Sequence, residues 1–438
     1  MADDVMKRRF STRNRIRAVP LAAAAIAAPT ILRHSTLAQQ AEIRITGWTS
    51  SDAENTLFSQ ILDDFRTANP DIKLNYEPIP ADYATKLQTD IAAGSVADVF
   101  YVDSLLAPDF MVNNQLLELD PYMAKSNVSA SDFYPGLVGA FQYNGKTYGL
   151  PKDWSGLAMV YGTDALTAAG ITTPPANWDD LRTAAQTLAD KAGEPRICLA
   201  ADIAREFAFH YAAGGEVISD DGTKIVIDSP EGKTALDFFY GLYKDGLATT
   251  PADSGAEWPG DALAKGFSDI VFEGNWIFPF LKDSAPDLKF GIAEMPDGPA
   301  GKATLAFTVS FSAFAGTKQP DAAWTVINYL TGAEGMGKWT DLGLAMPTRP
   351  ALSDHWQQQF PDREPFIKGG DYAHGWQLGP GGQAFYNDAN ADLQALFAGT
   401  QDSATTLKHW QKSAEDRITL GGTATPTGSP VASPDTGS

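Results

Sequence analysis

The sequence lacks most of the features that identify a catalytic or metal-binding protein. Of its 438 residues only one is Cys and five are His. An internal disulfide is therefore impossible, and the histidines are too scattered to give the spacing of a metal site. The phosphate-binding glycine loop, the GxSxG nucleophile motif and the HExxH zinc motif are also absent. We expect no enzymatic activity, no bound metal and no cofactor.

Positive charge is also scarce. The chain has 33 Lys and Arg against 54 Asp and Glu, a formal net charge of −21. Neutralising phosphates requires a basic surface, so this balance argues against nucleic-acid binding and against adhesion to an anionic membrane. Hydrophobic residues make up 44% and charged residues 20% of the chain. These are values of a globular protein with a substantial core.

The two ends of the chain differ from the rest. Residues 1–38 hold seven Lys or Arg and two Asp, followed by the run "AVPLAAAAIAAPTIL" and then "STLAQQ". This order is typical of an export signal, and "KRRF" is similar to a twin-arginine signal with Lys in the first arginine position. The apolar run is too short for a membrane span, and the alternative is a basic tail. We predict export, and a disordered Gly-, Pro-, Ser- and Thr-rich tail over residues 421–438.

Strand and helix patterns alternate along the chain that follows. "EIRITGW" alternates apolar and polar residues, and "SDAENTLFSQILDDFRTANP" has apolar residues at helical spacing. "DIKLNYEPIP", "DYATKLQTDIAAG" and "ADVFYVD" then read as strand, helix and strand. This order predicts an α/β fold with parallel strands, in which ligands bind at the carboxyl ends of strands. Trp48 and Asp103 stand at two such ends.

Several segments, in this order, resemble the extracellular solute-binding proteins of ABC importers, in the sugar-binding, maltose-binding-protein-like branch. They are "TANPDIKLNYEPIP", "YATKLQTDIAAGSVADVFYVD", "NGKTYGLPKDWSGLAMVYGTDAL", "QPDAAWTVINYLTG" and the final "GTQDSATTLKHWQKSAEDRI". The resemblance spans about residues 42–420. It implies a two-lobed periplasmic-binding-protein-like (type II) fold with crossing hinge segments. The expected N-lobe is 42–150 with 307–345, and the expected C-lobe is 151–304 with 346–420.

The stretch "VFEGNWIFPF", residues 271–280, places polar residues inside an apolar run. Three interpretations compete: a turn in the core, an aromatic ligand platform, or a catalytic carboxylate. In the resembled family a Gly and a Trp at this place form part of the cleft wall, which implies that Trp276 stacks on a sugar. A pyranose has an apolar face for an aromatic ring and a hydroxyl rim for carboxylates and amides. Glu273 and Asn275 are the neighbouring candidates for that rim.

Other candidates have a structural alternative beside the binding role. Trp48 is either a platform or a lid over the sheet, and Glu54 stands where a helix dipole favours a carboxylate in any case. Tyr83 suits a surface helix position equally well, and Arg349 suits an ion pair near a hinge. The complete set of predicted ligand contacts is Trp48, Glu54, Tyr83, Asp103, Asp153, Trp154, Glu273, Asn275, Trp276, Arg349 and Trp376.

The resemblance implies the extracytoplasmic binding component of an ABC importer. We expect it to bind a mono- to oligosaccharide between its lobes, as a monomer, and to deliver it to the transmembrane permease subunits. The first alternative is the same fold binding a polyamine or another small polar solute. An anionic solute is not expected, because the predicted contacts lack clustered Arg or Lys. The distant alternative is a secreted glycoside hydrolase with two carboxylates about 5–10 Å apart.

Overall fold

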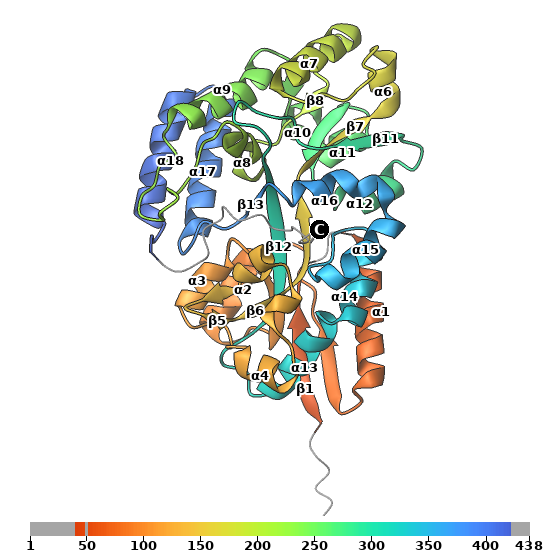
Figure 1. Ribbon diagram of the computed structural model, residues 1–438, viewed down its shortest axis with the longest axis vertical. Coiled ribbons are helices and arrows are strands. Elements are labelled where there is room, and N and C mark those ends of the chain that lie inside the picture. Colours follow the sequence, from red (N-terminus) through yellow and green to blue (C-terminus); the bar gives the residue numbers. More distant parts are fainter. Residues whose placement is uncertain (1–39, 49–50, 422–438) are drawn as a thin grey trace, which may run out of the picture. The chain divides into compact units, whose positions relative to one another are not determined.

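The computed structural model describes residues 40–48 and 51–421, and its strands form two sheets and one hairpin (Figure 1). The predicted export signal and all but the first residue of the predicted tail lie outside these residues. No helix in the described part of the chain is long and apolar enough to cross a membrane.

The first sheet has six strands in the order β13-β12-β3-β1-β2, with β6 beside β12. β1 pairs in parallel with β2 and with β3, as the alternating pattern predicted, whereas β12 runs antiparallel to β3 and β6. The strands are β1 (Ala41–Thr46), β2 (Ile72–Tyr76), β3 (Val99–Asp103), β6 (Gly149–Gly156), β12 (Thr304–Ala313) and β13 (Ala373–Gly375).

Helices cover both faces of this sheet. Successive side chains of β3 point to opposite sides, and because they are apolar on both sides, both faces have to be buried. Val99 and Tyr101 share a core with α1 and α13, while Phe100 and Val102 share another with α2 and α3. The surrounding helices are α1 (Asp52–Ala68), α2 (Tyr83–Ala93), α3 (Ala107–Val112), α4 (Asp120–Lys125), η1 (Ala130–Asp132), α5 (Pro135–Gly139), α13 (Pro320–Leu330) and α14 (Ala333–Thr340).

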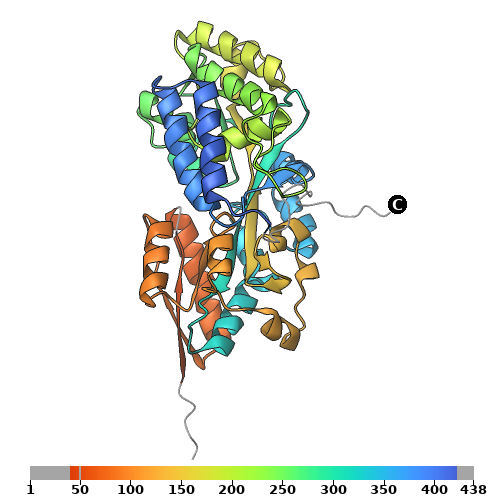
Figure 2. The same ribbon diagram turned by 90° about the vertical axis from the view of Figure 1, so that its left-hand side faces the viewer.

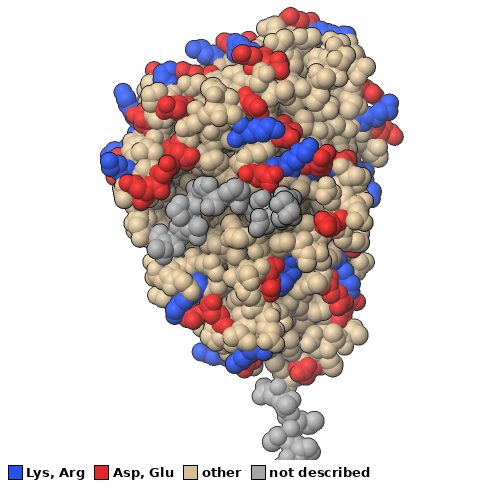
Figure 3. Space-filling view, viewed as in Figure 1, with Lys and Arg blue, Asp and Glu red and all other residues tan. Residues whose placement is uncertain are grey.

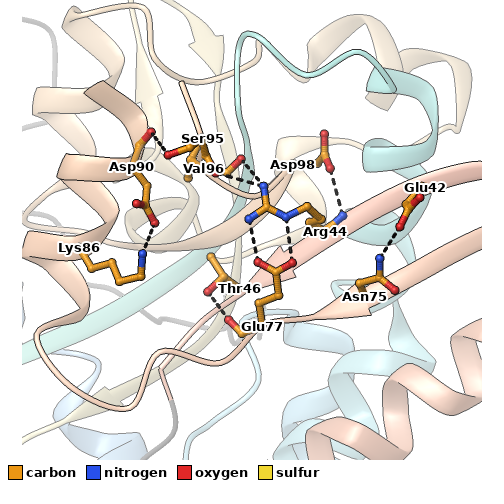
Figure 4. Close-up of polar contacts among 10 residues, drawn as sticks. All are labelled: Glu42, Arg44, Thr46, Asn75, Glu77, Lys86, Asp90, Ser95, Val96 and Asp98. Atoms are coloured by element: carbon orange, nitrogen blue, oxygen red, sulfur yellow. Dashed lines mark hydrogen bonds and ion pairs between the residues drawn. The ribbon is translucent and has the colours of Figure 1, made fainter. Parts of the chain in front are cut away.

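An arginine on β1 joins the edge of this sheet to the loop before β3 (Figure 4). Arg44 forms a two-point ion pair with Glu77, at 2.9 and 2.7 Å, and also donates to the carbonyls of Ser95 and Val96. Its backbone N–H donates to Asp98 at 3.0 Å. These contacts hold the loop that leads into β3, and therefore the position of the β3 carboxyl end.

The second sheet has five strands in the order β11-β7-β10-β8-β9. These are β7 (Ala158–Gly162), β8 (Ile197–Cys198), β9 (Ala248–Thr249), β10 (Ile270–Glu273) and β11 (Phe290–Ala293). Its helices are α6 (Thr163–Ala168), α7 (Trp178–Ala192), α8 (Ile203–Ala212), α9 (Pro230–Lys244), α10 (Pro251–Ser254), α11 (Pro259–Ala264), α12 (Ile277–Ser284), α17 (Gly382–Phe397) and α18 (Ser403–Arg417). Figure 2 shows α17 and α18 packed side by side as two blue helices.

The predicted hairpin turn at Asn144 and Gly145 is confirmed. These residues join β4 (Gln142–Tyr143) to β5 (Lys146–Thr147), which pair antiparallel. Asn144 has φ 51° and Gly145 has φ 71°, which a two-residue turn with both central residues left-handed requires.

The chain passes between the two sheets through segments that lie side by side. β12 pairs with β6 from Ala306 to Ser312, and Trp154 of β6 bridges to Met346 in the segment before α15 (Pro350–Gln359). Beyond α15 the chain continues through η2 (Pro361–Arg363) and α16 (Glu364–Gly369). The two-lobed α/β class with crossing segments is confirmed, and the exact lobe boundaries stay a prediction.

Charges of both signs are interspersed on the visible face of the molecule. Figure 3 shows scattered Lys and Arg, many of them with Asp or Glu beside them. The exposed ion pairs of the described residues include Lys73 with Glu42 at 2.8 Å. The visible face therefore shows no broad basic surface that would attract a polyanion.

Candidate binding site

A pocket of about 230 Å³ opens between the two sheets. It is lined from the six-stranded sheet by the ends of β1 and β3 and by β6 and β12, and from the other side by α8 and by the turn before α12. Carboxyl ends of parallel strands meet here, where α/β sheets bind ligands. The lining residues are Trp48, Glu54, Asp103, Lys152, Asp153, Trp154, Ser155, Arg205, Trp276, Phe307, Val309, Leu344 and Ala345.

Asp103, at the end of β3, brings a carboxylate without a counter-charge to the pocket. Its Oδ1 accepts the backbone N–H of Leu105 at 2.8 Å, and no ion pair joins it to any described residue. Burial raises the pKa of Asp103 to about 6, although the Leu105 hydrogen bond acts to lower it. At neutral pH this carboxylate is largely ionised and has lone pairs left to accept hydroxyl groups.

Trp48 and Glu54 form the adjoining wall. Two tyrosines hold the Trp48 ring edge-on, Tyr83 at 5.0 Å and Tyr101 at 5.1 Å between ring centroids. Glu54 is buried in the first turn of α1, where its backbone N–H donates to the Ser51 hydroxyl at 3.1 Å. That helix start places an acidic side chain in the pocket and favours it through the helix dipole.

A bulge in β6 turns two charged side chains of opposite sign toward the same region. Val309 of β12 pairs with Asp153, and Ser310 pairs with Pro151, so Lys152 is one extra residue on β6. The Lys152 ammonium forms an ion pair with Asp153 and lies 4.1 Å from the centre of the Trp339 ring. Trp339 also donates its indole N–H to Asp153 at 2.6 Å. The Lys152–Asp153 ion pair therefore has no net charge, is nearly buried and is held in place by Trp339.

The turn from β10 to α12 contains the polar residues of the stretch 271–280, for which three interpretations were open. Glu273 is fully buried at the end of β10, and its Oε2 accepts from the Arg205 guanidinium and from the Trp276 indole, both at 2.8 Å. The guanidinium lies 5.6 Å from the Trp276 ring centre. Trp276 packs against the hydrophobic cores of both sheets and lines the pocket. The turn is thus a rigid support for an aromatic side wall.

Arg205 is the cation of this wall. Besides Glu273 it contacts Asp202 at 3.2 Å. Burial alone would lower the pKa of Arg205, but the Glu273 and Asp202 carboxylates hold it above its ordinary value. Arg205 Nε, Glu273 Oε1 and both amide atoms of Asn275 have no hydrogen-bond partner among the described residues. Of these three residues only Arg205 lines the pocket.

The structure brings together six of the eleven predicted contacts and places five elsewhere. Glu273 and Asn275 are fully buried behind Trp276, and Tyr83 donates its hydroxyl to the Tyr101 carbonyl at 2.9 Å. Trp376 lies in the core behind Phe307, with 5.7 Å between the two ring centroids. Six predicted contacts line the pocket: Trp48, Glu54, Asp103, Asp153, Trp154 and Trp276.

Arg349 lies away from the pocket. Its Nε donates to the Thr331 carbonyl at 2.7 Å, its guanidinium is 3.6 Å from the Asp132 carboxylate, and it stacks over Phe133 at 4.2 Å. These contacts match the predicted alternative of an ion pair near a hinge, because Arg349 lies three residues after Met346, which bridges to Trp154 of β6.

Sequence reasoning missed both cations of the pocket, Lys152 and Arg205. The prediction was that the predicted contacts lack clustered Arg or Lys; the pocket lining holds one Lys and one Arg, each paired with a carboxylate. Lys152 is brought in by a bulge that alternation does not reveal. Arg205 had a signal: "IAREFAFHYA" is a mostly apolar helix with a lone Arg-Glu pair in its first turn. Charges that interrupt an apolar helix often belong to a site or to a buried ion pair.

The pocket offers ring faces, hydrogen-bond acceptors and paired charges. It has no arrangement of a nucleophile with an activating base among the lining residues. Across the described part of the chain no cluster of three or more His, Cys, Asp or Glu is placed to hold a metal ion. What the geometry supports is reversible binding of a small polar molecule with an apolar face.

Comparisons with known proteins agree with this fold. A family model described as bacterial extracellular solute-binding protein matches residues 49–337. A binding protein of Brucella abortus (strain 2308) is 31% identical over 323 residues, which cover 72% of this chain and 78% of that protein.

Two further proteins are similar. An erythritol/L-threitol-binding protein of Mycolicibacterium smegmatis is 26% identical over 316 residues, covering 65% of this chain and 66% of that protein. An ABC substrate-binding protein from Listeria monocytogenes, solved in complex with cycloalternan, superposes with a TM-score of 0.79 at 23% identity. That superposition covers 86% of this chain and 99% of the other.

Proposed function

Because the chain belongs to the family of bacterial extracellular solute-binding proteins, we propose that its pocket captures a carbohydrate and presents it to the permease of an ABC importer. The observation that carries this proposal is the pairing of Trp276 with Asp103 in one pocket. An aromatic ring covers the C–H face of a sugar, and a carboxylate without a counter-ion accepts its hydroxyl groups.

The charge balance favours a neutral ligand. Lys152 is paired with Asp153, and Arg205 is paired with two carboxylates. No cation among the described lining residues is left unpaired to attract an anion. A pocket of 230 Å³ has the volume of about eight water molecules at about 30 Å³ each, which suits a polyol or a single sugar ring. The erythritol/L-threitol and cycloalternan ligands of the two similar proteins are also polyhydroxylated.

The test uses the chain without residues 1–38. Its thermal stability is measured against mono- and disaccharides, polyols, polyamines and amino acids, and each ligand that gives a shift is checked for breakdown. A ligand at about 100-fold over its Kd adds about 2.7 kcal/mol of stability. A shift with a sugar or polyol that stays intact supports the proposal. A shift only with polyamines moves the assignment to the alternative ligand class, and sugar breakdown moves it to a hydrolase.

A tryptophan variant then locates the ligand. Trp276→Ala weakens binding of that ligand about tenfold or more, since stacking aromatic residues are typical anchors. The control is Trp258→Ala, because Trp258 is also partly exposed in the same lobe, packs on Phe280 and does not line the pocket. Isothermal titration gives the affinity and circular dichroism confirms folding. Equal affinities for the folded Trp276→Ala protein and the wild type would refute the platform.

A further inference from the structure

A second pocket lies on the other side of the crossing segments. Its volume is about 210 Å³. Trp154 of β6 lines both pockets, and the segment before α15 divides between them: Ala345 lines the first pocket, and Met346 and Pro347 line the second. The two pockets are therefore neighbours that share Trp154 in their walls. The proposed sugar site does not use the second pocket.

Three aromatic rings line this second pocket, and each has its polar end occupied by the protein. The Tyr134 hydroxyl pairs with the Ser353 hydroxyl at 2.8 Å. Trp154 donates its indole N–H to the Pro347 carbonyl at 3.1 Å, and Trp356 donates to the Thr340 carbonyl, also at 3.1 Å. Tyr134, Trp154 and Trp356 are 7%, 3% and 2% exposed, and because their polar ends are occupied, the small parts that line the pocket are carbon surface. The faces of aromatic rings carry partial negative charge.

Two carboxylates at the rim complete the arrangement. Asp354 and Asp371 are exposed residues of the lining, and neither forms an ion pair or a side-chain hydrogen bond with any described residue. Burial raises the pKa of Tyr134, the Ser353 hydrogen bond lowers it, and both carboxylates raise it further, as expected if they lie near its hydroxyl. Lys368 also lines the pocket, but its ammonium is 3.0 Å from Glu364.

We propose that this second pocket binds a small organic cation with an alkylammonium head group. A cation is attracted to the face of an aromatic ring, and quaternary ammonium groups are bound in this way. The two carboxylates supply the opposite charge at the mouth of the pocket. A volume of 210 Å³ corresponds to about seven water molecules at about 30 Å³ each, enough for a trimethylammonium group with a short chain.

The test compares choline with 3,3-dimethylbutan-1-ol, which has the same shape without the charge. Both are titrated calorimetrically into the chain without residues 1–38, at low ionic strength and up to about 10 mM, a range that covers millimolar affinity. We expect saturable binding of choline and at least about tenfold weaker binding of the alcohol, a difference of about 1.4 kcal/mol. Equal binding of the two probes, or no saturable binding of choline, would overturn the proposal.

Variants place the cation in the second pocket. Asp354→Asn/Asp371→Asn weakens choline binding about tenfold or more, whereas Asp287→Asn, which removes an exposed carboxylate of the loop before β11, leaves it unchanged. Asp103→Asn, in the first pocket, also leaves choline binding unchanged. Loss of choline binding in Asp103→Asn, with retention in the double variant, would assign the cation to the first pocket and refute the second site. Neither outcome depends on whether the protein binds a sugar.

Discussion

The ionised form of Asp103 suits ligand binding but lowers the stability of the folded protein. Its pKa is about 6 in the folded protein and close to 3.8 in the unfolded chain. The folded state therefore holds the proton more tightly, and the resulting stability is present below pH 3.8 and is lost as the pH rises through 6. At neutral pH the folded protein carries an ionised, partly buried carboxylate that water would solvate better.

The variant Asp103→Asn should therefore stabilise the ligand-free protein at pH 7.5 by about 1–3 kcal/mol and change it little at pH 4, because one pKa unit corresponds to about 1.36 kcal/mol. The same variant should weaken sugar binding, since an amide is a poorer hydroxyl acceptor than a carboxylate. Urea denaturation at the two pH values and calorimetric titration measure the two effects. If the variant is less stable than the wild type at pH 7.5, the carboxylate is held by a favourable contact instead.

Residue types at strand ends were the predictable part of the site. Trp48 and Asp103 follow apolar strands, and the rule that α/β sheets bind ligands there was enough to select them. Glu273 and Asn275 show its limit, because residues that flank a platform in sequence need not face the ligand. Here Glu273 turns back to hold Arg205 and Trp276. The direction of the Glu273 side chain depends on where α8 lies relative to β10, and no local sequence pattern predicts that arrangement.

At the scale of elements, the crossing strands pack too closely for side chains at one position. Gly149 begins β6 and pairs with Ser312 of β12. A Cβ added at Gly149 would lie 2.5 Å from the hydroxyl oxygens of both Ser310 and Ser312. Its backbone is not left-handed, so glycine is needed here for the close approach of two strands rather than for an unusual φ.

We expect Gly149→Ala to destabilise the protein by about 1–3 kcal/mol, the usual cost of overpacking a tight interior. The matched control is Gly241→Ala in α9, where an added Cβ meets nothing within 4 Å. That control should gain about 0.5–1 kcal/mol, because Ala restricts the unfolded chain and favours the helix. Denaturant midpoints of both variants test the pair. A Gly149→Ala protein as stable as the wild type would show that the strands separate without cost.

Regular elements were well predicted by periodicity, and irregular ones were not. α1 and α2 lie where the sequence pattern predicted helices, and α1 begins one residue after Ser51, whose side chain caps it. The bulge at Lys152 breaks the period-two rule in the middle of β6. One extra residue turns a buried ion pair toward the pocket, and the sequence pattern did not reveal this bulge.

At the scale of the whole molecule, the pocket depends on both sheets at once. β3, β6 and β12 supply Asp103, Asp153 and Val309 from the six-stranded sheet, while α8 and the turn after β10 supply Arg205 and Trp276. The two sets are joined only through the crossing segments and through contacts such as those of Trp276 with both cores. A ligand that touches both sets favours whichever arrangement of the sheets lets it do so.

Hydrogen exchange measures this coupling directly. With ligand at about 100-fold over its Kd, amides that exchange only through opening of the pocket should slow by about 100-fold, equivalent to about 2.7 kcal/mol. We expect this protection in residues 152–156 and 304–309 and also in residues 203–206 and 273–277, because the ligand links both sides. Trp276→Ala should lose the second group of protections while keeping part of the first. Protection confined to the six-stranded sheet in the wild type would mean that the ligand binds this sheet alone. Arg205 of α8 and Trp276 of the turn after β10 would then take no part in binding.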